Sequence, residues 1–541
     1  MNFVPFGQQL YNIMQGHKSI NEKLFYQFRI SERVPEDNFY RRLKGALDLS
    51  FLRNQASEFY GQCGQESIDT VVFFKMLLVG YLENVIYDRR LVEFCSMRMD
   101  VLYFLDYDID EPLPWHSTIS RTRKLFKKEL FEKLFNKVLG LCIEKGMVAG
   151  HTQSVDAAFV KANASLDSLE VKKAPCDSAS YVNKSFEANE GPKRKAQNDH
   201  GGPQQRTLAS PRHELREVKR RQRQWKEEGT PRLGSEDHRA RYLSNHTHYS
   251  PTDPDARIAV KPGKPRNLVF NSNLSVDTAN HVITNIQADF ADKKDSRYLK
   301  SIVENTSKRL GAFGIQIDNI LADTGFSSGE NYKTLEEKHI KAFIPAHGQY
   351  EGGREGFTYE KEQGQWKCPN NKYLTFRKIK TDAKGNQFRM YLTRRSDCKG
   401  CPLKQQCIGK QHECRMMVTI YKDYYDRAIL RGKSKVGKRM KKLRQSTVEP
   451  VFGSLLNFYG MSKVSARGID CAHKSMLMAA IAYNLKKYMK YAPKKVGTMA
   501  LELTTCTNSL FKSVLRYFSS IWSVFDLHNK KTYYLMIAQK R

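Results

Sequence analysis

The N-terminal part of the chain carries apolar residues at the spacing of α-helices. Residues 71–82 (VVFFKMLLVGYL) place apolar side chains on successive helical turns, and a second such segment runs from Leu91 to Phe104. The sequence DEPLP at 110–114 ends this pattern, because its two prolines do not continue a helix. Ser117 is then a candidate N-cap of a further helix. The pattern predicts an all-α N-terminal domain at residues 1–145.

The last helix of this predicted domain is basic. Its cationic residues are Arg121, Arg123, Lys124, Lys127 and Lys128. Helices joined by a tight turn, the last one basic, are typical of helix-turn-helix DNA-binding domains. We therefore expect Ser117, Arg121 and Arg123 to contact DNA. The alternative interpretation is an ordinary helical bundle with a solvated basic face.

From residue 149 onward the pattern becomes strand-like. The predicted strands are short segments at 152–160, 268–276, 282–288, 315–322 and 340–345. A helical segment at 299–310 lies between the third and fourth of them. This order predicts an α/β domain at 149–490, with a mixed sheet flanked by helices.

Two insertions and a tail interrupt this plan. Residues 172–265 are poor in aliphatic side chains, and 192–241 contain 14 Lys or Arg against 7 Asp or Glu. Such a stretch buries too little apolar surface to fold alone. Its middle, Glu214 to Glu228, is either a basic helix that forms on a phosphate backbone or part of a solvated flexible insertion. Residues 350–420 form a second insertion with clustered cysteines, and 491–541 are a tail without an assigned role.

Charge and composition narrow the class of protein. The 541 residues carry a formal net charge of +33, with 40% hydrophobic residues. A surplus of this size indicates a polyanionic partner, most often nucleic acid. No apolar run reaches the roughly 20 residues that span a bilayer, and the first residues lack the layout of a signal peptide. Eleven cysteines are too sparse for a disulfide scaffold. We expect a cytoplasmic nucleic-acid-binding protein with no membrane partner.

Three carboxylates are the candidate catalytic residues. Asp156 lies inside an apolar strand pattern, where an unpaired acid is costly to bury. Asp323 follows another predicted strand, and Glu449 begins an apolar segment. Acids at the ends of strands of one sheet, closed by a third from a packed helix, form a cage for Mg²⁺. Each acid alone is more often a helix cap or an ion-pair partner, so only the trio is informative.

A dense basic run precedes Glu449, with 8 Lys or Arg among residues 431–444. We expect phosphate contacts from Lys438, Arg439, Lys441, Lys442 and Arg444. The alternative is a solvated basic helix. Pro450 disfavours a helical conformation at the residue before it. A helix that starts at Pro450 would therefore place Glu449 at its entrance.

The cysteines form a second cluster of candidate metal ligands, after the carboxylates. Cys398, Cys401, Cys407 and Cys414 are separated by two, five and six residues, so the set contains one close pair of the kind that binds zinc. Cys368 is a candidate fourth ligand from a preceding turn. The alternative is a set of reduced thiols without metal.

Several segments together resemble the DDE transposases of bacterial insertion sequences. PWHSTISR at 114–121 is similar to the P-x-H-S-T-I-S-R segment of that family's helical DNA-binding domain. SVDA at 154–157 resembles its first-Asp strand, and ADTGF at 322–326 its second-Asp motif. Arg444, Val448, Glu449, Phe452 and Gly453 match the glutamate motif, and Arg467-Gly468 with AYNL at 482–485 match the last helices. The resemblance covers most of residues 20–490.

This resemblance implies an RNase H-like core in which Asp156, Asp323 and Glu449 hold two Mg²⁺ ions, with Mn²⁺ as a substitute. Such an enzyme binds the transposon ends as double-stranded DNA, cleaves them, and joins their 3′-hydroxyl groups to target DNA. The resemblance also implies a homodimer assembled on DNA and a place at the bacterial nucleoid. For a structural zinc ion it favours Cys368, Cys398, Cys401 and Cys407 over Cys414.

Two other functions remain open from the sequence. One is a metal-dependent nuclease on the same core, which cuts DNA without joining it. The other is a catalytically inactive DNA-binding protein derived from a transposase.

Overall fold

The computed structural model describes residues 29–61, 67–171, 244–245, 248–260, 265–346, 354–382 and 385–492. The chain divides into two compact units, residues 1–79 with 87–125, and residues 80–86 with 126–541. The predicted helix at 214–228 and nearly all of the basic insertion lie outside the described residues, as does the tail from 493. The predicted domain limits of 1–145, 149–490 and 491–541 are kept as a proposal.

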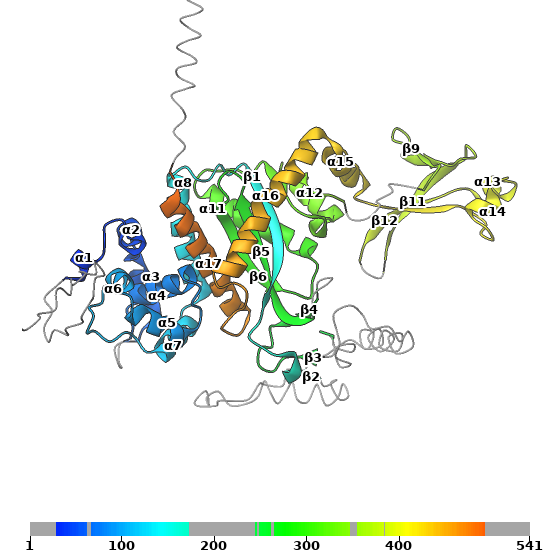
Figure 1. The fold of residues 1–541 in the computed structure, drawn as a ribbon. Coiled ribbons are helices and arrows are strands. Elements are labelled where there is room, and N and C mark those ends of the chain that lie inside the picture. The colour runs from blue at the N-terminus through cyan, green and yellow to red at the C-terminus, as the bar shows by residue number, and fades with distance from the viewer. Residues whose placement is uncertain are drawn as a thin grey trace, which may run out of the picture. The chain divides into compact units, whose positions relative to one another are not determined.

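The first unit is helical, as the apolar spacing predicts (Figure 1). Its elements are α1 (Ile30–Arg33), α2 (Phe39–Ala46), α3 (Phe51–Ala56), η1 (Ser57–Phe59), α4 (Thr70–Leu82), α5 (Asp88–Ser96), α6 (Met99–Leu105) and α7 (His116–Leu125). Asn38 caps α2, since its side chain accepts hydrogen bonds from the amides of Tyr40 and Arg41. On α4, Phe73, Phe74 and Leu78 are fully buried and form the centre of the unit.

Two sequence predictions in this unit need correction. The segment from Leu91 to Phe104 is not one helix, because Arg98 is extended between α5 and α6 and pairs with Asp100. Ser117 is not an N-cap, because α7 already begins at His116.

The second unit contains a six-stranded mixed sheet. Its strands are β1 (Thr152–Lys161), β4 (Arg257–Ala259), β5 (Asn267–Asp277), β6 (Ile283–Phe290), β7 (Asn319–Leu321) and β8 (Lys341–Phe343). From one edge the order is β6, β5, β1, β7, β8. β4 pairs with the same edge of β5 as β6 does, at the start of β5. β5 is antiparallel to both β6 and β1, whereas β1, β7 and β8 are parallel. This is the order of an RNase H-like sheet, so the predicted fold class is confirmed.

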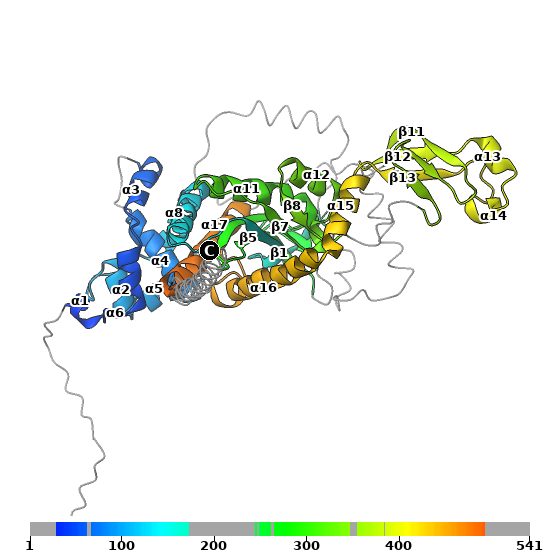
Figure 2. The ribbon, with the colours of Figure 1, turned by 90° about the horizontal axis from the view of Figure 1, so that it is seen from above.

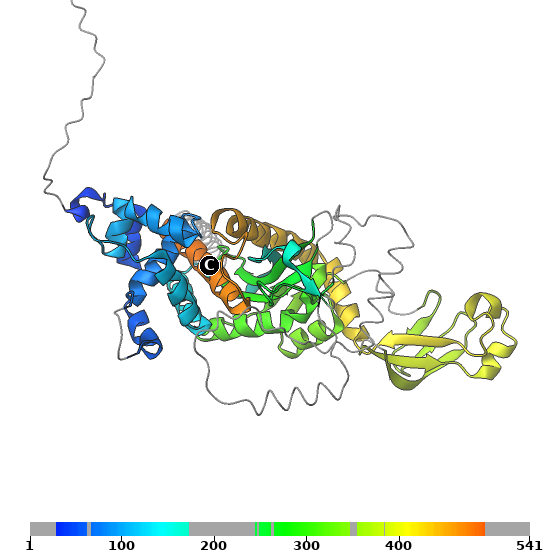
Figure 3. The ribbon, with the colours of Figure 1, turned by 90° about the horizontal axis from the view of Figure 1, so that it is seen from below.

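Helices cover both faces of this sheet. Figure 2 shows the strands between a layer with α11 (Leu299–Gly311) and α12 (Gly329–Glu337) and, on the other side, α16 (Lys435–Phe458). Figure 3 shows the same order of layers from the opposite direction. The helices around this sheet also include α8 (Lys128–Glu144), α15 (Lys422–Lys433) and α17 (Ile469–Lys490). Turn η2 (Leu166–Ser168) and the short pair β2 (Glu170–Val171) and β3 (His248–Tyr249) follow β1.

α17 is almost wholly buried, from Ala472 to Leu485. His473 on this helix lies 3.0 Å from Glu132 of α8, and Arg309 of α11 lies 3.5 Å from the same carboxylate. The hydrogen bond with His473 is the main cause that holds the pKa of Glu132 below its usual range. These polar contacts join three helices at one half-buried carboxylate.

Pro450 lies inside α16 rather than at its start. Glu449 is therefore mid-helix, and the prediction that it stands at a helix entrance is wrong. Pro450 has no N–H, so the helix lacks the hydrogen bond from this position to the Ser446 carbonyl. Ser446 is exposed, so its carbonyl can bond to water instead. Val448, Val451 and Leu455 are completely buried, and this packing outweighs the lost bond.

A separate five-stranded antiparallel sheet lies within the predicted insertion at 350–420 (Figure 1). Its order is β13 (Arg415–Thr419), β12 (Gln387–Leu392), β11 (Tyr373–Thr381), β10 (Gln365–Lys367) and β9 (Thr358–Glu360). Two short helices, α13 (Arg395–Lys399) and α14 (Lys404–Cys407), connect β12 to β13. Among the described helices of the whole chain, none has the length and apolarity that crossing a membrane requires.

The first prediction concerns Asn484, which satisfies both backbone groups of Ile283 on β6. Its side chain donates to the Ile283 carbonyl and accepts from the Ile283 amide, both at 2.9 Å and both buried. We expect Asn484→Leu to lower the free energy of unfolding by about 2–4 kcal/mol, because two buried backbone groups lose their partners. Urea denaturation measures this, with Asn457→Leu at an exposed site of α16 as the control. Equal effects of the two variants would contradict the assignment.

Candidate active site

The register of the sheet brings two of the predicted acids to the same level. Ser154 of β1 pairs with Leu321 of β7 in a parallel ladder. Asp156 and Asp323 each follow two residues later on these neighbouring strands. Residues two apart in a strand share a face, and adjacent strands lie about 4.8 Å apart. The two carboxylates therefore start from adjacent points of the sheet.

A tight turn fixes Asp323. Its Oδ1 accepts a hydrogen bond of 2.8 Å from the amide of Gly325 and so caps the turn η5 (Thr324–Phe326). A β-carbon added at Gly325 would lie 3.0 Å from Asp323 Oδ1 and 3.3 Å from Asp295 Oδ2. A side chain at position 325 would therefore crowd both carboxylates, which lie on either side of this point.

Asp295 is an acid near the site that sequence reasoning missed. It opens the turn η4 (Asp295–Arg297), and its Oδ1 accepts a 3.0 Å hydrogen bond from Asn271 Nδ2 of β5. The charged stretch around it, DKKDSR at 292–297, has no motif or periodicity. Only the approach of η4 to η5 shows that it lies beside Asp323.

Arg444 links the third acid to the first. From α16 its guanidinium lies 3.2 Å from Asp156 Oδ2 and 3.8 Å from Glu449 Oε1. The side chains of Asp156 and Arg444 are 18% and 14% exposed, whereas Glu449 is 60% exposed. The structure therefore brings Asp156 and Glu449 to one cation, although they come from a strand and a helix far apart in the sequence.

The four other predicted phosphate contacts of the basic run lie on α16. Lys438, Arg439, Lys441 and Lys442 are all exposed. Ser434 caps this helix through the amide of Gly437. A β-carbon at Gly437 would lie 2.2 Å from the Arg431 carbonyl, so glycine permits the close junction between α15 and α16. The basic residues thus form an exposed cationic surface next to the carboxylates.

The three predicted DNA contacts of the helical unit differ in their environments. Arg121 is exposed on α7, and its guanidinium lies 3.4 Å from Ser117 Oγ. Arg123 is buried and forms two hydrogen bonds to the Asp88 carboxylate. The guanidinium of Arg123 therefore stabilises the packing of α7 on α5, and we do not retain it as a DNA contact.

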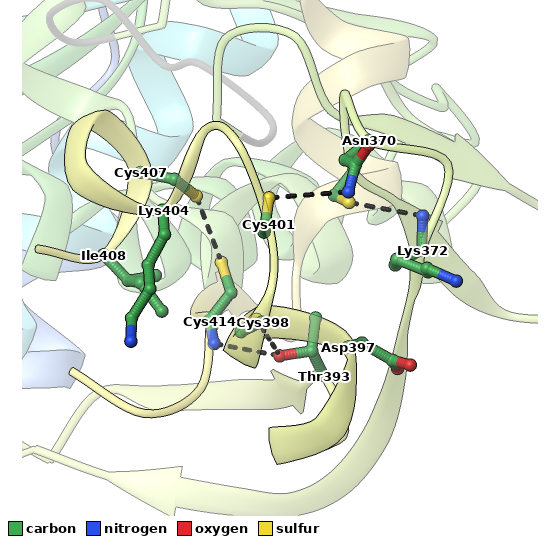
Figure 4. Close-up of a pocket in the computed structure, with 11 residues that line it drawn as sticks. Asn370, Lys372, Thr393, Asp397, Cys398, Cys401, Lys404, Cys407, Ile408 and Cys414 are labelled. Carbon is green, nitrogen blue, oxygen red and sulfur yellow. Dashed lines mark hydrogen bonds between the residues drawn. The ribbon is translucent and has the colours of Figure 1, made fainter.

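Five cysteines line one pocket in the separate sheet (Figure 4). They are Cys368, Cys398, Cys401, Cys407 and Cys414. The sulfurs of Cys407 and Cys414 lie 3.9 Å apart, and burial together with Cys407 raises the pKa of Cys414 to about 12. Across the described ranges, no three His, Cys, Asp or Glu side chains already stand in the geometry of a metal site.

Comparison with known proteins identifies two family domains. A model of a transposase domain, DUF772, matches residues 28–125, and a model of a transposase DDE domain matches residues 367–489. The second match includes Glu449 and the five pocket cysteines but not Asp156 or Asp323. No curated protein matches the chain. A cryo-EM structure of the piggyBac transposase synaptic complex with hairpin DNA is similar over 86% of this chain and 82% of that chain, with 10% identity and a TM-score of 0.21.

The second prediction concerns the cation between the carboxylates. We expect Arg444→Gln to lower the free energy of unfolding, measured in urea with EDTA, by about 1–2 kcal/mol, because the largely buried Asp156 loses its partner. Arg439→Gln, on the exposed side of the same helix, should change it by less than about 0.5 kcal/mol.

A double-mutant cycle with Asp156→Asn separates this ion pair from a general effect on α16. The two substitutions should be less destabilising together than the sum of the single changes, since each removes the same contact. Strict additivity would show that the two residues do not interact.

Proposed function

This chain belongs to the DDE transposases, and we propose that it binds transposon ends, cleaves the DNA there, and joins the 3′-hydroxyl ends to target DNA. The observation that supports this chemistry is that Asp156 and Glu449 both lie near the guanidinium of Arg444. Asp323 follows β7, the strand that pairs with β1, which carries Asp156. Carboxylates from two parallel strands and one covering helix are thereby directed to the same end of the sheet. The substrate is double-stranded DNA, first the transposon end and then the target.

The carboxylates fit divalent cations. Asp156 and Glu449 already share a positive charge, that of Arg444, and their ligating atoms are carboxylate oxygens, which Mg²⁺ and Mn²⁺ prefer. We propose that Asp156, Asp323 and Glu449 hold two Mg²⁺ ions, for which Mn²⁺ can substitute. When bound, such a pair supplies the nucleophile and stabilises the leaving oxygen in phosphoryl transfer.

The residues of the chain have distinct tasks in this proposal. The ladder between β1 and β7 sets the separation of the two aspartates, and the Gly325 amide orients Asp323. Arg444 offsets part of the negative charge of Asp156 and Glu449. If the carboxylates held metal ions, its guanidinium would be available to a phosphate oxygen of the DNA.

DNA affinity comes from the cationic surfaces. The exposed side chains of Lys438, Arg439, Lys441 and Lys442 lie on the same helix as Glu449, so DNA that contacts them passes the carboxylates. In the helical unit, Ser117 and Arg121 are the proposed contacts. We further propose that the chain acts as a homodimer assembled on two transposon ends, at the nucleoid in the bacterial cytoplasm.

The third prediction tests the catalytic residues. Asp156→Asn and Asp323→Asn should each reduce Mg²⁺-dependent nicking of a labelled transposon end by about 10³-fold or more, since losing a ligand forfeits several kcal/mol of transition-state stabilisation. DNA affinity should stay nearly the same or rise slightly, because each change removes a negative charge near the phosphates. Nicking and gel shift measure the two quantities.

Asp318→Asn is the matched control, because this exposed acid precedes β7 whereas Asp323 follows it. It should nick at the wild-type rate. Wild-type nicking by the Asp156 and Asp323 variants would refute their catalytic role. Nicking without strand joining by the wild-type chain would indicate the nuclease, and no nicking at all would indicate an inactive DNA-binding protein.

The fourth prediction tests the cationic surface of α16. Changing all four of its residues to Ala should weaken binding to every DNA sequence alike, because phosphate contacts carry no sequence information. The slope of log K against log salt should flatten by up to about 0.9 per lost contact. The substituted residues are Lys438, Arg439, Lys441 and Lys442.

A control with equal loss of charge shows whether position matters. Four exposed lysines outside α16 serve for it, namely Lys137, Lys300, Lys308 and Lys341. Their replacement by Ala should change the salt slope less. Equal slopes for both quadruple variants, in gel shifts over a salt series, would show that only net charge matters.

A further inference from the structure

The five-stranded sheet has a small hydrophobic core. Strand β11 is exposed at every position except Leu374, and β9 and β10 have three residues each. The buried cluster consists of Trp366, Leu374, Tyr391, Cys398, Cys414, Met416 and Val418. Small folds with cores of this size usually need a disulfide or a metal ion for stability.

Two separate loops of this sheet bring cysteines to the same pocket. Cys368 lies in the turn between β10 and β11, whereas the other four lie between β12 and β13, in or beside α13 and α14. Asn370 of the first loop donates a hydrogen bond of 3.5 Å to Cys401 Sγ of the second. Figure 4 shows the sulfurs around one space between these loops.

N–H donors contact four of the five sulfurs, since Arg354 Nη1 reaches Cys414 Sγ at 3.8 Å as well as Cys407. The Lys372 amide donates to Cys368 Sγ at 3.3 Å, Asn370 Nδ2 to Cys401 Sγ, and Arg354 Nη1 to Cys407 Sγ at 3.6 Å. N–H donors stabilise the thiolate form of a cysteine and orient it as a metal ligand. Lys372, Lys404 and Asp397 also line the pocket, and the two lysine ammonium groups point away from the sulfurs (Figure 4).

Cys414 differs from these residues in its setting. It precedes β13 directly, and its backbone is tied to Thr393, whose Oγ1 accepts from the Cys414 amide at 2.9 Å and whose amide donates to the Cys414 carbonyl at 3.1 Å. Its side chain is 2% exposed and belongs to the apolar cluster, as does that of Cys398, which is 8% exposed. The 3.9 Å between its sulfur and that of Cys407 is about twice a disulfide bond length, so the two are not bonded.

We propose that Cys368, Cys398, Cys401 and Cys407 bind one structural zinc ion, which holds the β10–β11 turn against the α13–α14 loop. Cys398 and Cys401 provide the close pair from one loop, Cys407 follows from the same loop, and Cys368 closes the site from the other. The sulfurs now stand around a pocket rather than around one point, so the side chains turn inward when zinc binds. Cys414 remains a buried thiol behind the site. The proposal does not depend on the transposition reaction.

The fifth prediction is the metal content of the full chain and its cysteine variants. Protein purified from zinc-supplied cells should contain about one zinc per chain, and after exchange with Co²⁺ it should show the intense absorption of tetrahedral thiolate coordination. Cys368→Ser and Cys401→Ser should lose the zinc and expose 354–419 to protease. The matched control Cys414→Ser, in the same pocket, and Cys471→Ser on α17 should retain it.

Cys401→His distinguishes loss of a ligand from failure to fold, because imidazole is also a zinc ligand. This variant should retain zinc and resist protease like the wild type, whereas Cys401→Ser should not. A wild-type chain without zinc whose protease resistance is unchanged by chelator would overturn the site. Retention of zinc by Cys368→Ser together with its loss in Cys414→Ser would overturn the ligand assignment.

Discussion

The candidate site depends on the pairing of β1 along both of its edges. β5 binds one edge in an antiparallel ladder and β7 binds the other in a parallel one, so Asp156 lies in the middle of the sheet. The same parallel register sets the level at which Asp323 leaves β7. A shift of the pairing by one residue would turn Asp156 to the opposite face, away from α16. Strand register, more than any single contact, therefore positions the two aspartates.

A sheet with an acid at its centre needs a compensating cation, and α16 provides it. Arg444 contacts Asp156 and Glu449 together, while the other basic residues of this helix remain exposed. One helix thus carries a carboxylate of the site, the cation that neutralises it, and the surface proposed for DNA phosphates. Buried Val448, Val451 and Leu455 hold it on the sheet despite Pro450. The packing of α16 on the sheet therefore positions Glu449 and the proposed phosphate-binding residues together.

The five-stranded sheet obeys a different constraint. The main core is closed by long buried helices such as α17, whereas this sheet has a cluster of seven buried side chains, two of them cysteines. A hydrogen bond from Asn370 to the Cys401 sulfur joins two of its loops. In the proposed zinc site the thiols would add stability that the main core obtains from burial.

The sequence by itself determined the elements and the residue types of the site. Strand-like and helical runs of apolar residues located β1, β5, β6 and α11 to within two residues of their observed bounds, although β5 is buried on both faces. Asp156, Asp323 and Glu449 stood out because acids interrupt or border apolar segments. Tertiary structure alone decided their partners. The Arg444 bridge, the approach of Asp295 to Asp323 and the burial of Arg123 against Asp88 join residues whose separation along the chain carries no periodic signal. The helix through Pro450 likewise depends on packing, which local propensity does not contain.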